Sequence, residues 1–293
     1  MHPQPSLAER FRDQHRAGPV LLPNAWDAAS ARVFEEAGFA AIGTTSAGIA
    51  YAQGYRDAER IGRSEMIRAV ATIVNAVSCP VSADIEAGYG TSPADVAVTV
   101  DAVLDAGAAG INLEDNAHDR GTPRLFDVDR QCARIAAARE AGERRGVALT
   151  INARTDAFLL GLGSDANERI RQTIDRGSQY LRAGADLVFV PLVVDPVTVR
   201  QLSDALDGRL SLMALPGAPS ARDLFAAGAA RVSIGQLAML ATLGSLKRIA
   251  DEMRSQGTWR SIESTFYGFA EAERLFPSAE PASMVRNVQD VAG

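Results

Sequence analysis

The stretch LDAGAAGINLED, residues 104–115, contains the pattern that predicts the fold. It starts at the end of an amphipathic run, continues with Ala-Gly and ends in apolar residues. Glycine at this point suits the left-handed residue that closes a helix, and the apolar run suits a strand buried on both faces of a parallel sheet. The pattern returns in EEAGFAAIGTT (35–45), LRAGADLVFVP (181–191) and FAAGAARVSIG (225–235).

Counted along the chain, these units predict an α/β protein built as one closed (β/α)8 barrel of the TIM type. Helical runs begin at start signals such as Ser64-Glu65, Ser92-Pro93 and Asp195-Pro196. Eight units in 293 residues fit a closed barrel better than a doubly wound sheet. The predicted strands lie near residues 19–23, 40–45, 80–85, 110–114, 148–153, 187–191, 210–215 and 231–234.

The predicted barrel accounts for residues 1–256 as one domain, and an aromatic-rich C-terminal helix remains in residues 257–293. This extension would cover the barrel bottom or pack on another subunit.

Composition excludes several classes of function. Hydrophobic residues make up 47% of the chain, and the net charge of −6 argues against a nucleic-acid-binding surface. No apolar run is long enough to span a bilayer, and the N-terminal stretch carries charges where a signal peptide needs an apolar core. Cys79 and Cys132 match no metal or redox spacing. We expect a soluble, cytoplasmic protein that binds neither nucleic acid nor membrane.

Candidate site residues collect where the predicted strands end, which is where the active groups of such barrels lie. The first five strands end in polar groups, and the last three end in apolar or small residues. The candidates in chain order are Asn24, Trp26 and Asp27, then Thr44, Thr45 and Ser46, then Asp84 and Glu86, then Glu114 and Asp115, then Asn152, Arg154, Thr155 and Asp156.

The carboxylates among these candidates predict a metal site. Asp84 and Glu86 point the same way because side chains alternate along a strand, and Glu114 ends the neighbouring strand. Three converging acids favour a hard divalent cation, Mg²⁺ or alternatively Mn²⁺, held through oxygen and water. The alternative is that these acids pair with arginines or cap the next helix.

Arg154 and the turn at Thr45, Ser46 and Gly48 are candidates for binding an anionic substrate. A planar guanidinium can hold a substrate carboxylate by two hydrogen bonds, although Arg154 could equally pair with Glu114 or Asp156. The N–H groups of the small-residue turn could face an oxyanion, or the segment could be a plain strand-to-loop turn.

These residues resemble the isocitrate lyase/phosphoenolpyruvate mutase superfamily along residues 5 to 255. The resemblance rests on LPNAWDAASARVFEEAGFAAIGTTSAG, DIEAGYG, GAAGINLED and NARTDA in this order and spacing. It implies a (β/α)8 barrel that binds Mg²⁺, processes small 2-oxo acids through an enolate, and forms a homo-oligomer, a dimer or a homotetramer, with a C-terminal helix swapped between neighbours.

The resemblance also assigns roles to residues. It implies that Asp84, Glu86 and Glu114 hold the metal and that Asp57 lies near the metal waters. Thr45 and Ser46 fall where the family contacts the 2-oxo carboxylate, Arg154 falls on its substrate arginine, and Trp26 and Gly48 would add contacts to the substrate. The family usually has Asp where Glu86 stands.

The loop NAHDRGTPRLFD, residues 116–127, departs from the family pattern. It lacks the Lys-Lys/Arg-Cys-Gly-His signature of isocitrate and methylisocitrate lyases and the Lys-x-x-Pro-Lys pattern associated with phosphonopyruvate chemistry. His118 is the one histidine in this loop, and its ordinary pKa suits proton transfer, although it could be a solvated loop residue. Arg120 and Arg124 could bind a second carboxylate or a phosphonate.

The sequence therefore predicts a Mg²⁺-dependent lyase that cleaves a C–C bond of a small 2-oxo or 2-hydroxy di- or tricarboxylate, giving a pyruvate-type enolate. It is expected to be neither isocitrate lyase nor methylisocitrate lyase. The alternatives are C–P bond chemistry of the phosphonopyruvate type, a non-catalytic 2-oxo-acid-binding protein, and a phosphate-binding biosynthetic barrel that uses LPGAPS and SIG after the last two strands.

Overall fold

The structure is a computed structural model, and it describes residues 5–118 and 124–276. The chain divides into two compact units, Met1–Lys247 and Arg248–Gly293. The division falls inside helix α10, Leu237–Gln256, earlier than the predicted boundary after residue 256.

The first unit contains one parallel sheet in the order β1-β9-β8-β7-β6-β5-β4-β3-β2. β1 corresponds to the first predicted strand, near residues 19–23, and β2 follows it after Pro23, which has no N–H to donate to a ladder. Because β1 pairs with β9 and β2 pairs with β3, the sheet closes on itself and the predicted barrel is confirmed. The strands are β1 Val20–Leu22, β2 Asn24–Ala25, β3 Ile42–Thr44, β4 Val81–Asp84, β5 Gly110–Glu114, β6 Thr150–Arg154, β7 Leu187–Phe189, β8 Leu210–Met213 and β9 Arg231–Ser233.

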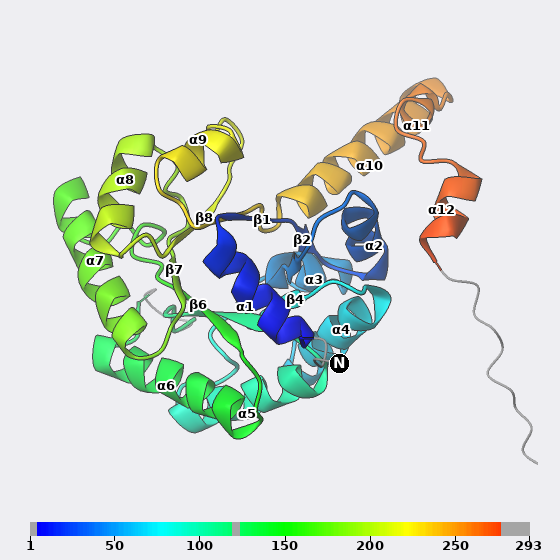
Figure 1. Cartoon of the computed structure of the whole chain (residues 1–293). Coiled ribbons are helices and arrows are strands. Elements are labelled where there is room, and N and C mark those ends of the chain that lie inside the picture. Colours follow the sequence, from blue (N-terminus) through cyan, green and yellow to red (C-terminus); the bar gives the residue numbers. More distant parts are fainter. Residues whose placement is uncertain (1–4, 119–123, 277–293) are drawn as a thin grey trace, which may run out of the picture. The chain divides into compact units, whose positions relative to one another are not determined.

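Helices alternate with these strands and surround the barrel (Figure 1). Two predicted start signals are N-caps: the side chain of Ser92 accepts from Asp95 N–H, and that of Asp195 accepts from Thr198 N–H. The third prediction was displaced slightly, since α4 begins at Arg63. The helices of the first unit are α1 Leu7–Ala17, α2 Ala28–Glu36, α3 Ser46–Ala52, α4 Arg63–Ala76, α5 Pro93–Asp105, α6 Val128–Arg144, α7 Ala166–Arg182, α8 Pro196–Ala205 and α9 Ala221–Ala226.

The Ala-Gly pattern has the predicted backbone role at all four positions. Gly38, Gly107, Gly184 and Gly228 follow helices α2, α5, α7 and α9 with φ of 87°, 87°, 112° and 109°. These angles lie in the region that favours glycine, so the four residues end a helix and start the turn into a buried strand.

The strands turn apolar side chains outward and mainly polar side chains into the barrel. On β6, Ile151 and Ala153 belong to the core beneath the helices, whereas Thr150, Asn152 and Arg154 have the opposite parity and point inward. On β8, Leu212 lies in the outer core and Ser211 points inward. Barrels of this class usually fill their interior with branched apolar side chains, so the polar interior is unusual.

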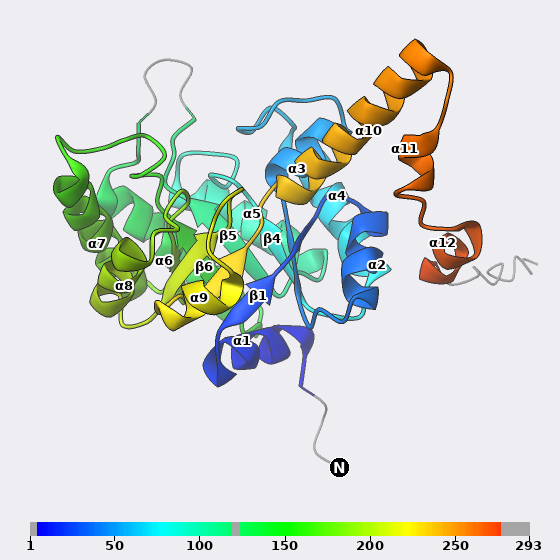
Figure 2. The ribbon, with the colours of Figure 1, turned by 90° about the horizontal axis from the view of Figure 1, so that it is seen from above.

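Helix α1 lies across the amino-terminal end of the barrel (Figure 2). A capping box between Ser6 and Glu9 starts this helix, and its Phe11 side chain is fully buried. A Cβ at Gly110 would lie 2.8 Å from Cε1 of Phe11, so glycine makes room for this ring. Phe11 thereby closes the bottom of the barrel, and the carboxyl ends of the strands remain open at the other end.

In the second unit, the predicted single C-terminal helix is two short helices, α11 Arg260–Glu263 and α12 Phe269–Leu275. The helix prediction was wrong at Gly268, whose φ of 90° breaks the run. Glu252 accepts hydrogen bonds from Arg260 N–H (2.7 Å) and Ser261 N–H (2.8 Å) at the start of α11. In neither described range is a helix long and apolar enough to cross a membrane.

Candidate active site

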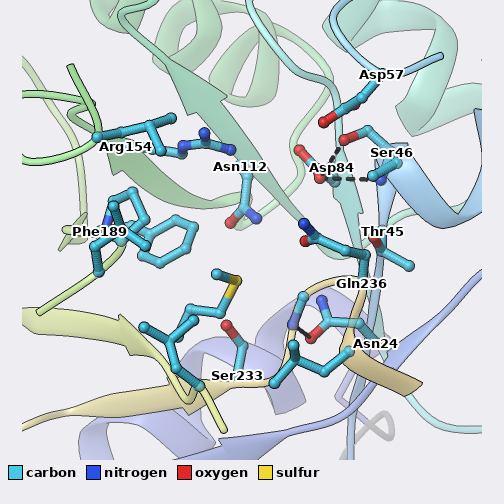
Figure 3. Close-up of a pocket in the computed structure, with 18 residues that line it drawn as sticks. Asn24, Thr45, Ser46, Asp57, Asp84, Asn112, Arg154, Phe189, Ser233 and Gln236 are labelled. Carbon is cyan, nitrogen blue, oxygen red and sulfur yellow. Dashed lines mark hydrogen bonds between the residues drawn. The ribbon is translucent and has the colours of Figure 1, made fainter. Parts of the chain in front are cut away.

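A cavity of about 300 Å³ lies at the carboxyl ends of the barrel strands (Figure 3). Its lining carries two carboxylates and one guanidinium, together with a set of apolar side chains, here called the apolar wall. The polar side chains include those of Asn24, Ser46, Asp57, Asp84, Asn112 and Arg154. The apolar residues are Leu159, Phe189, Leu192, Met213, Leu215 and Leu237.

Asp84 is fixed by its neighbours at the end of β4. Its Oδ2 accepts hydrogen bonds from Ser46 N–H at 3.1 Å and from Ser46 Oγ at 2.8 Å. Its own N–H donates to Thr44 Oγ1 at 2.8 Å. Asp84 thus ties β4 to the first turn of α3, and its side chain still lines the cavity (Figure 3).

The predicted oxyanion-binding turn at Thr45, Ser46 and Gly48 is wrong in one respect, because its N–H groups are already engaged. Thr45 N–H donates to Ala25 O, Ser46 N–H donates to Asp84, and Gly48 N–H donates to Thr45 Oγ1 at 3.3 Å. The turn is the start of α3, with Thr45 as its N-cap. Thr45 and Ser46 nevertheless line the cavity.

Arg154 lies between two acids, as the alternative interpretation of this residue predicted. Its Nη1 is 2.7 Å from Glu114 Oε2, its Nε is 2.6 Å from Asp156 Oδ1, and its Nη2 donates to Asp156 Oδ2 at 3.1 Å. Burial opposes the charge on Arg154, but Glu114 and Asp156 outweigh it and raise the pKa of the guanidinium. Two of its three nitrogens therefore bind Asp156, and the third binds Glu114.

Glu86 points away from the cavity and does not line it. Its backbone has a φ of 50°, and its carboxylate accepts from Glu59 N–H at 2.5 Å and from Tyr89 Oη at 2.9 Å. Burial, followed by the charges of Asp84 and Asp57, raises the pKa of Glu86 to about 8. Glu86 holds together the loops that follow α3 and β4.

His118 forms an ion pair with Glu114, with 2.6 Å between Nε2 and Oε1. Its side chain is only 13% exposed, so the interpretation as a solvated loop residue is wrong. Burial lowers the pKa of His118, but Glu114 outweighs burial and raises it to about 9. His118 is charged at neutral pH and is the last described residue before position 119.

The structure does not bring the side chains of the predicted metal triad, Asp84, Glu86 and Glu114, together as one set. Within residues 5–118 and 124–276, no three His, Cys, Asp or Glu side chains are arranged to hold a metal ion. The physical reason is that Glu86 is used by Glu59 and Tyr89, and Glu114 is used by Arg154 and His118.

Asp57 and Asp84 remain as carboxylates that face the cavity (Figure 3). Burial, and to a smaller extent the charge of Asp84, raises the pKa of Asp57. Mg²⁺ commonly binds through one or two carboxylates and completes its shell with water and substrate oxygens. The donor set of this cavity fits that mode of binding.

Two predicted substrate contacts lie outside the cavity lining. Trp26 packs against the core cluster that contains Ile49 and Met66. A Cβ at Gly48 would lie 2.6 Å from Thr45 Cγ2 and 3.0 Å from Trp26 Cβ, so Gly48 permits close packing in α3. Arg120, predicted as a second anion-binding group, lies outside the described residues; Ala117 N–H donates to the carbonyl of Arg124 in the described part of this loop.

Sequence reasoning missed Asn112 and the apolar wall. Asn112 has the same parity on β5 as Glu114, and its Oδ1 accepts from Asn152 Nδ2 at 2.7 Å. This parity was a usable signal for an inward-facing side chain. Phe189 and Met213 also point inward from strand ends that looked merely apolar in the sequence.

Comparison with protein families and relatives gives a consistent result. The family model described as phosphoenolpyruvate phosphomutase matches residues 11–254. An uncharacterized protein of Mycobacterium tuberculosis is 38% identical over 228 residues, which cover 78% of this chain and 82% of that protein. The 2-methylisocitrate lyase of Escherichia coli is 26% identical over 262 residues, or 85% of each chain.

Solved structures share the fold. A candidate phosphonomutase of Burkholderia cenocepacia superposes with a TM-score of 0.79 at 39% identity, covering 84% of this chain and 98% of the other. 2,3-Dimethylmalate lyase superposes with a TM-score of 0.77 at 26% identity, covering 88% and 90%. Phosphonopyruvate hydrolase, solved with oxalate and Mg²⁺, has a TM-score of 0.79 at 24% identity, covering 92% and 95%.

Proposed function

Because the chain belongs to the phosphoenolpyruvate phosphomutase family of the isocitrate lyase/phosphoenolpyruvate mutase superfamily, we propose that it is a Mg²⁺-dependent lyase. The proposed reaction breaks the C3–C4 bond of a small 2-oxo acid, which leaves a pyruvate-type enolate. In a 2-hydroxy acid it breaks the C2–C3 bond instead: the hydroxyl loses its proton, C2 becomes the carbonyl of a 2-oxo acid, and C3 leaves as a carbanion that is then protonated. Relatives in this superfamily are lyases and phosphonate enzymes, and 2-methylisocitrate lyase and 2,3-dimethylmalate lyase are both lyases by name.

The observation that carries the proposal is the charge balance of the cavity. The positive charges of Arg154 and His118 are already met by Glu114 and Asp156. Asp57 and Asp84 then face the cavity without a cation of their own among the described lining residues. A substrate carboxylate would add negative charge to this wall, so its binding needs a further positive charge.

Asp84 and Asp57 are the residues that would hold the metal. A bound Mg²⁺ supplies positive charge for the oxygen atoms of a 2-oxo acid and for the electrons that arrive there on bond cleavage. Ser46 keeps the Asp84 carboxylate in place by its two hydrogen bonds, so that one of its oxygens remains directed to the cavity.

Arg154 would orient the substrate. Glu114 and Asp156 fix its guanidinium in the cavity wall, where its remaining N–H bonds can reach a carboxylate in the cavity. A fixed guanidinium loses little freedom on binding, which favours a defined position of the scissile bond.

The apolar wall indicates which substrates fit best. Leu159, Phe189 and Met213 line the same cavity as Asp57 and Asp84. An alkyl substituent on the substrate would be stabilised there, at about 0.8 kcal/mol for each buried CH₂ group. Alkyl-substituted malates therefore suit the cavity better than tricarboxylates, whose additional carboxylates would lie against apolar side chains.

His118 is proposed as the general acid that protonates the departing or remaining carbanion. Its charge at neutral pH, maintained by Glu114, gives it a proton to donate. His118 contacts Glu114, and Glu114 is paired in register with Arg154 on β6, so the histidine lies close to the residue that would orient the substrate.

The test is turnover of a panel of 2-alkyl malates, oxaloacetate and phosphonopyruvate by the full chain, with release of 2-oxo acid and phosphate followed separately. We expect 2-oxo acid release that requires Mg²⁺ and that falls by about a thousandfold in Asp84→Asn. Ser203→Ala is the matched control, because Ser203 is buried outside the cavity and donates to Gly228 O. Phosphate release would favour C–P chemistry, and tight oxalate binding without turnover would favour a non-catalytic binder.

A further inference from the structure

The interior of the barrel contains a second polar cluster, which the proposed function does not use. Its centre is Arg231 on β9, whose side chain is 1% exposed. Neither Nε nor Nη1 of Arg231 has a hydrogen-bond acceptor among the described residues. Burial lowers the pKa of Arg231 to about 9, which still leaves the guanidinium charged at neutral pH.

Strands of the same barrel carry inward-facing residues with hydroxyl groups. Ser211 is the register partner of Arg231 on the neighbouring strand, and both side chains point inward. With the one-residue stagger per strand of an eight-stranded barrel, Leu22, Ser82, Asn152 and Ser211 form one inward layer, contributed by alternate strands. Ser82, Asn152 and Ser211 are each at most 2% exposed, and each has a buried oxygen without a protein partner.

The cluster is separated from the catalytic cavity and from the barrel bottom. Above it, Asn152 Nδ2 donates to Asn112 Oδ1, and Asn112 lines the cavity. Below it lies the ring of Phe11, whose centroid is 5.9 Å from Cζ of Arg231. The guanidinium is therefore held inside the barrel, above the ring that closes its lower end.

The polar groups of this cluster do not satisfy one another. The N–H groups at Nε and Nη1 of Arg231 can only donate, whereas the hydroxyls of Ser82, Ser211 and Thr150 can donate or accept. Among the described residues, none of these groups has a hydrogen-bond partner, and neither has Asn152 Oδ1. A buried guanidinium without an acceptor is costly, and removing a charge from water costs several kcal/mol in general.

The acid that acts on Arg231 electrostatically is Asp84, but its carboxylate is bound to Ser46 on the cavity side. The cluster thus combines a positive charge, N–H donors without an acceptor and nearly complete exclusion from solvent. These are the properties of a site for a ligand that accepts several hydrogen bonds and carries one negative charge.

We propose that the barrel interior binds a small monovalent anion of the halide type, held by the guanidinium of Arg231 and the hydroxyls of Ser82 and Ser211. The site is distinct from the substrate cavity and does not depend on the proposed lyase activity. Its role is structural: it supplies the buried arginine with a partner when the barrel is folded.

The experiment is urea unfolding of the full chain at constant ionic strength, with sodium chloride progressively replacing sodium gluconate. An anion that binds only the folded state raises the folded-to-unfolded ratio in proportion to its concentration above Kd. We expect a tenfold rise in that ratio for each tenfold rise in chloride in the wild-type protein. Ser211→Ala and Arg231→Met should show a much smaller dependence.

Ser203→Ala is the matched control, since its buried hydroxyl has a protein acceptor and lies outside the barrel interior. It should lower stability while keeping the full chloride dependence. If Arg231→Met does not fold, Ser211→Ala decides the outcome. A wild-type ratio independent of chloride, an unchanged dependence in Ser211→Ala, or bromide-soaked crystals without an anomalous peak beside Arg231 would overturn the proposal.

Discussion

Replacing Arg154 with methionine removes the cation between two buried acids and provides the sharpest test of the site's electrostatics. Arg154 makes three charge-assisted contacts of 2.6 to 3.1 Å, and its partners Glu114 and Asp156 are 3% and 0% exposed. Breaking a buried ion pair by removing one partner costs about 3–5 kcal/mol, because the remaining charge is left without compensation. Methionine preserves most of the side-chain volume, so the loss should come mainly from charge.

The pH dependence distinguishes this loss from a packing defect. Burial outweighs the effect of Arg154 and raises the folded-state pKa of Glu114 above its ordinary value of 4.5. The folded protein therefore binds more protons at this group than the unfolded protein does. Its contribution to stability falls as pH rises above 4.5. Without Arg154 this pKa rises further, and the fall extends to higher pH. We therefore expect the destabilisation of Arg154→Met to be larger at about pH 8 than at about pH 5, by on the order of 1–2 kcal/mol.

The measurement is urea unfolding of both proteins at the two pH values, with Arg139→Met as control. Arg139 also pairs with an acid, Asp186, at 2.6 Å, but that acid is 38% exposed and can be solvated. The loss of stability in Arg139→Met should be the same at about pH 5 as at about pH 8. An equal loss for Arg154→Met at about pH 5 and about pH 8 would refute the electrostatic account of this wall.

Three further substitutions probe neighbouring features. His118→Asn should lower turnover. It should also abolish the decline in rate that we expect for the wild type as pH passes about 9, and pH–rate profiles of both proteins would show this. An unchanged profile would exclude His118 from proton transfer. Glu86→Gln should gain stability relative to wild type as pH rises from 4.5 to about 8, because the raised pKa of Glu86 makes its charge unfavourable there; unfolding curves that move in parallel across this range would contradict this. Gly48→Ala should cost about 1–3 kcal/mol by overpacking against Thr45 and Trp26, while Gly18→Ala, at a position with no neighbour within 4 Å, should be nearly neutral in the same unfolding assay.

The fold could be predicted because its signals are local. Each Ala-Gly pair followed by an apolar run marks a helix end and a buried strand, and Gly107 has the predicted positive φ. The second short strand, β2, was not predicted, because the apolar run ends at Pro23 and the polar Asn24 follows it. The break at Gly268 depends on one backbone angle, and a continuous aromatic-rich run does not reveal that angle.

The site could be predicted only in part. The position of a residue at a strand end indicates that it lies near the site, but it does not indicate which other side chain it pairs with. Asp84 and Arg154 both line the cavity, since they lie at the carboxyl ends of β4 and β6, the two strands that flank β5. Parity alone suggested that Glu86 shares the direction of Asp84. The strand ends at Asp84, however, and the φ of 50° at Glu86 turns its side chain to Tyr89 instead.

The polar interior links the two sites proposed for this barrel. Burying polar and charged side chains inside a barrel costs free energy unless each has a partner. In this barrel the two signs of charge are separated along the axis. Acids exceed cations at the cavity, and Arg231 lies below it without an ion-pair partner among the described residues. Asp84 is the acid whose charge acts on Arg231, and it favours the charged form of the guanidinium. A cation above and an anion below would satisfy both surpluses without bringing the two protein charges together. The polar layer between the two proposed sites would then keep ions of opposite sign apart inside one barrel.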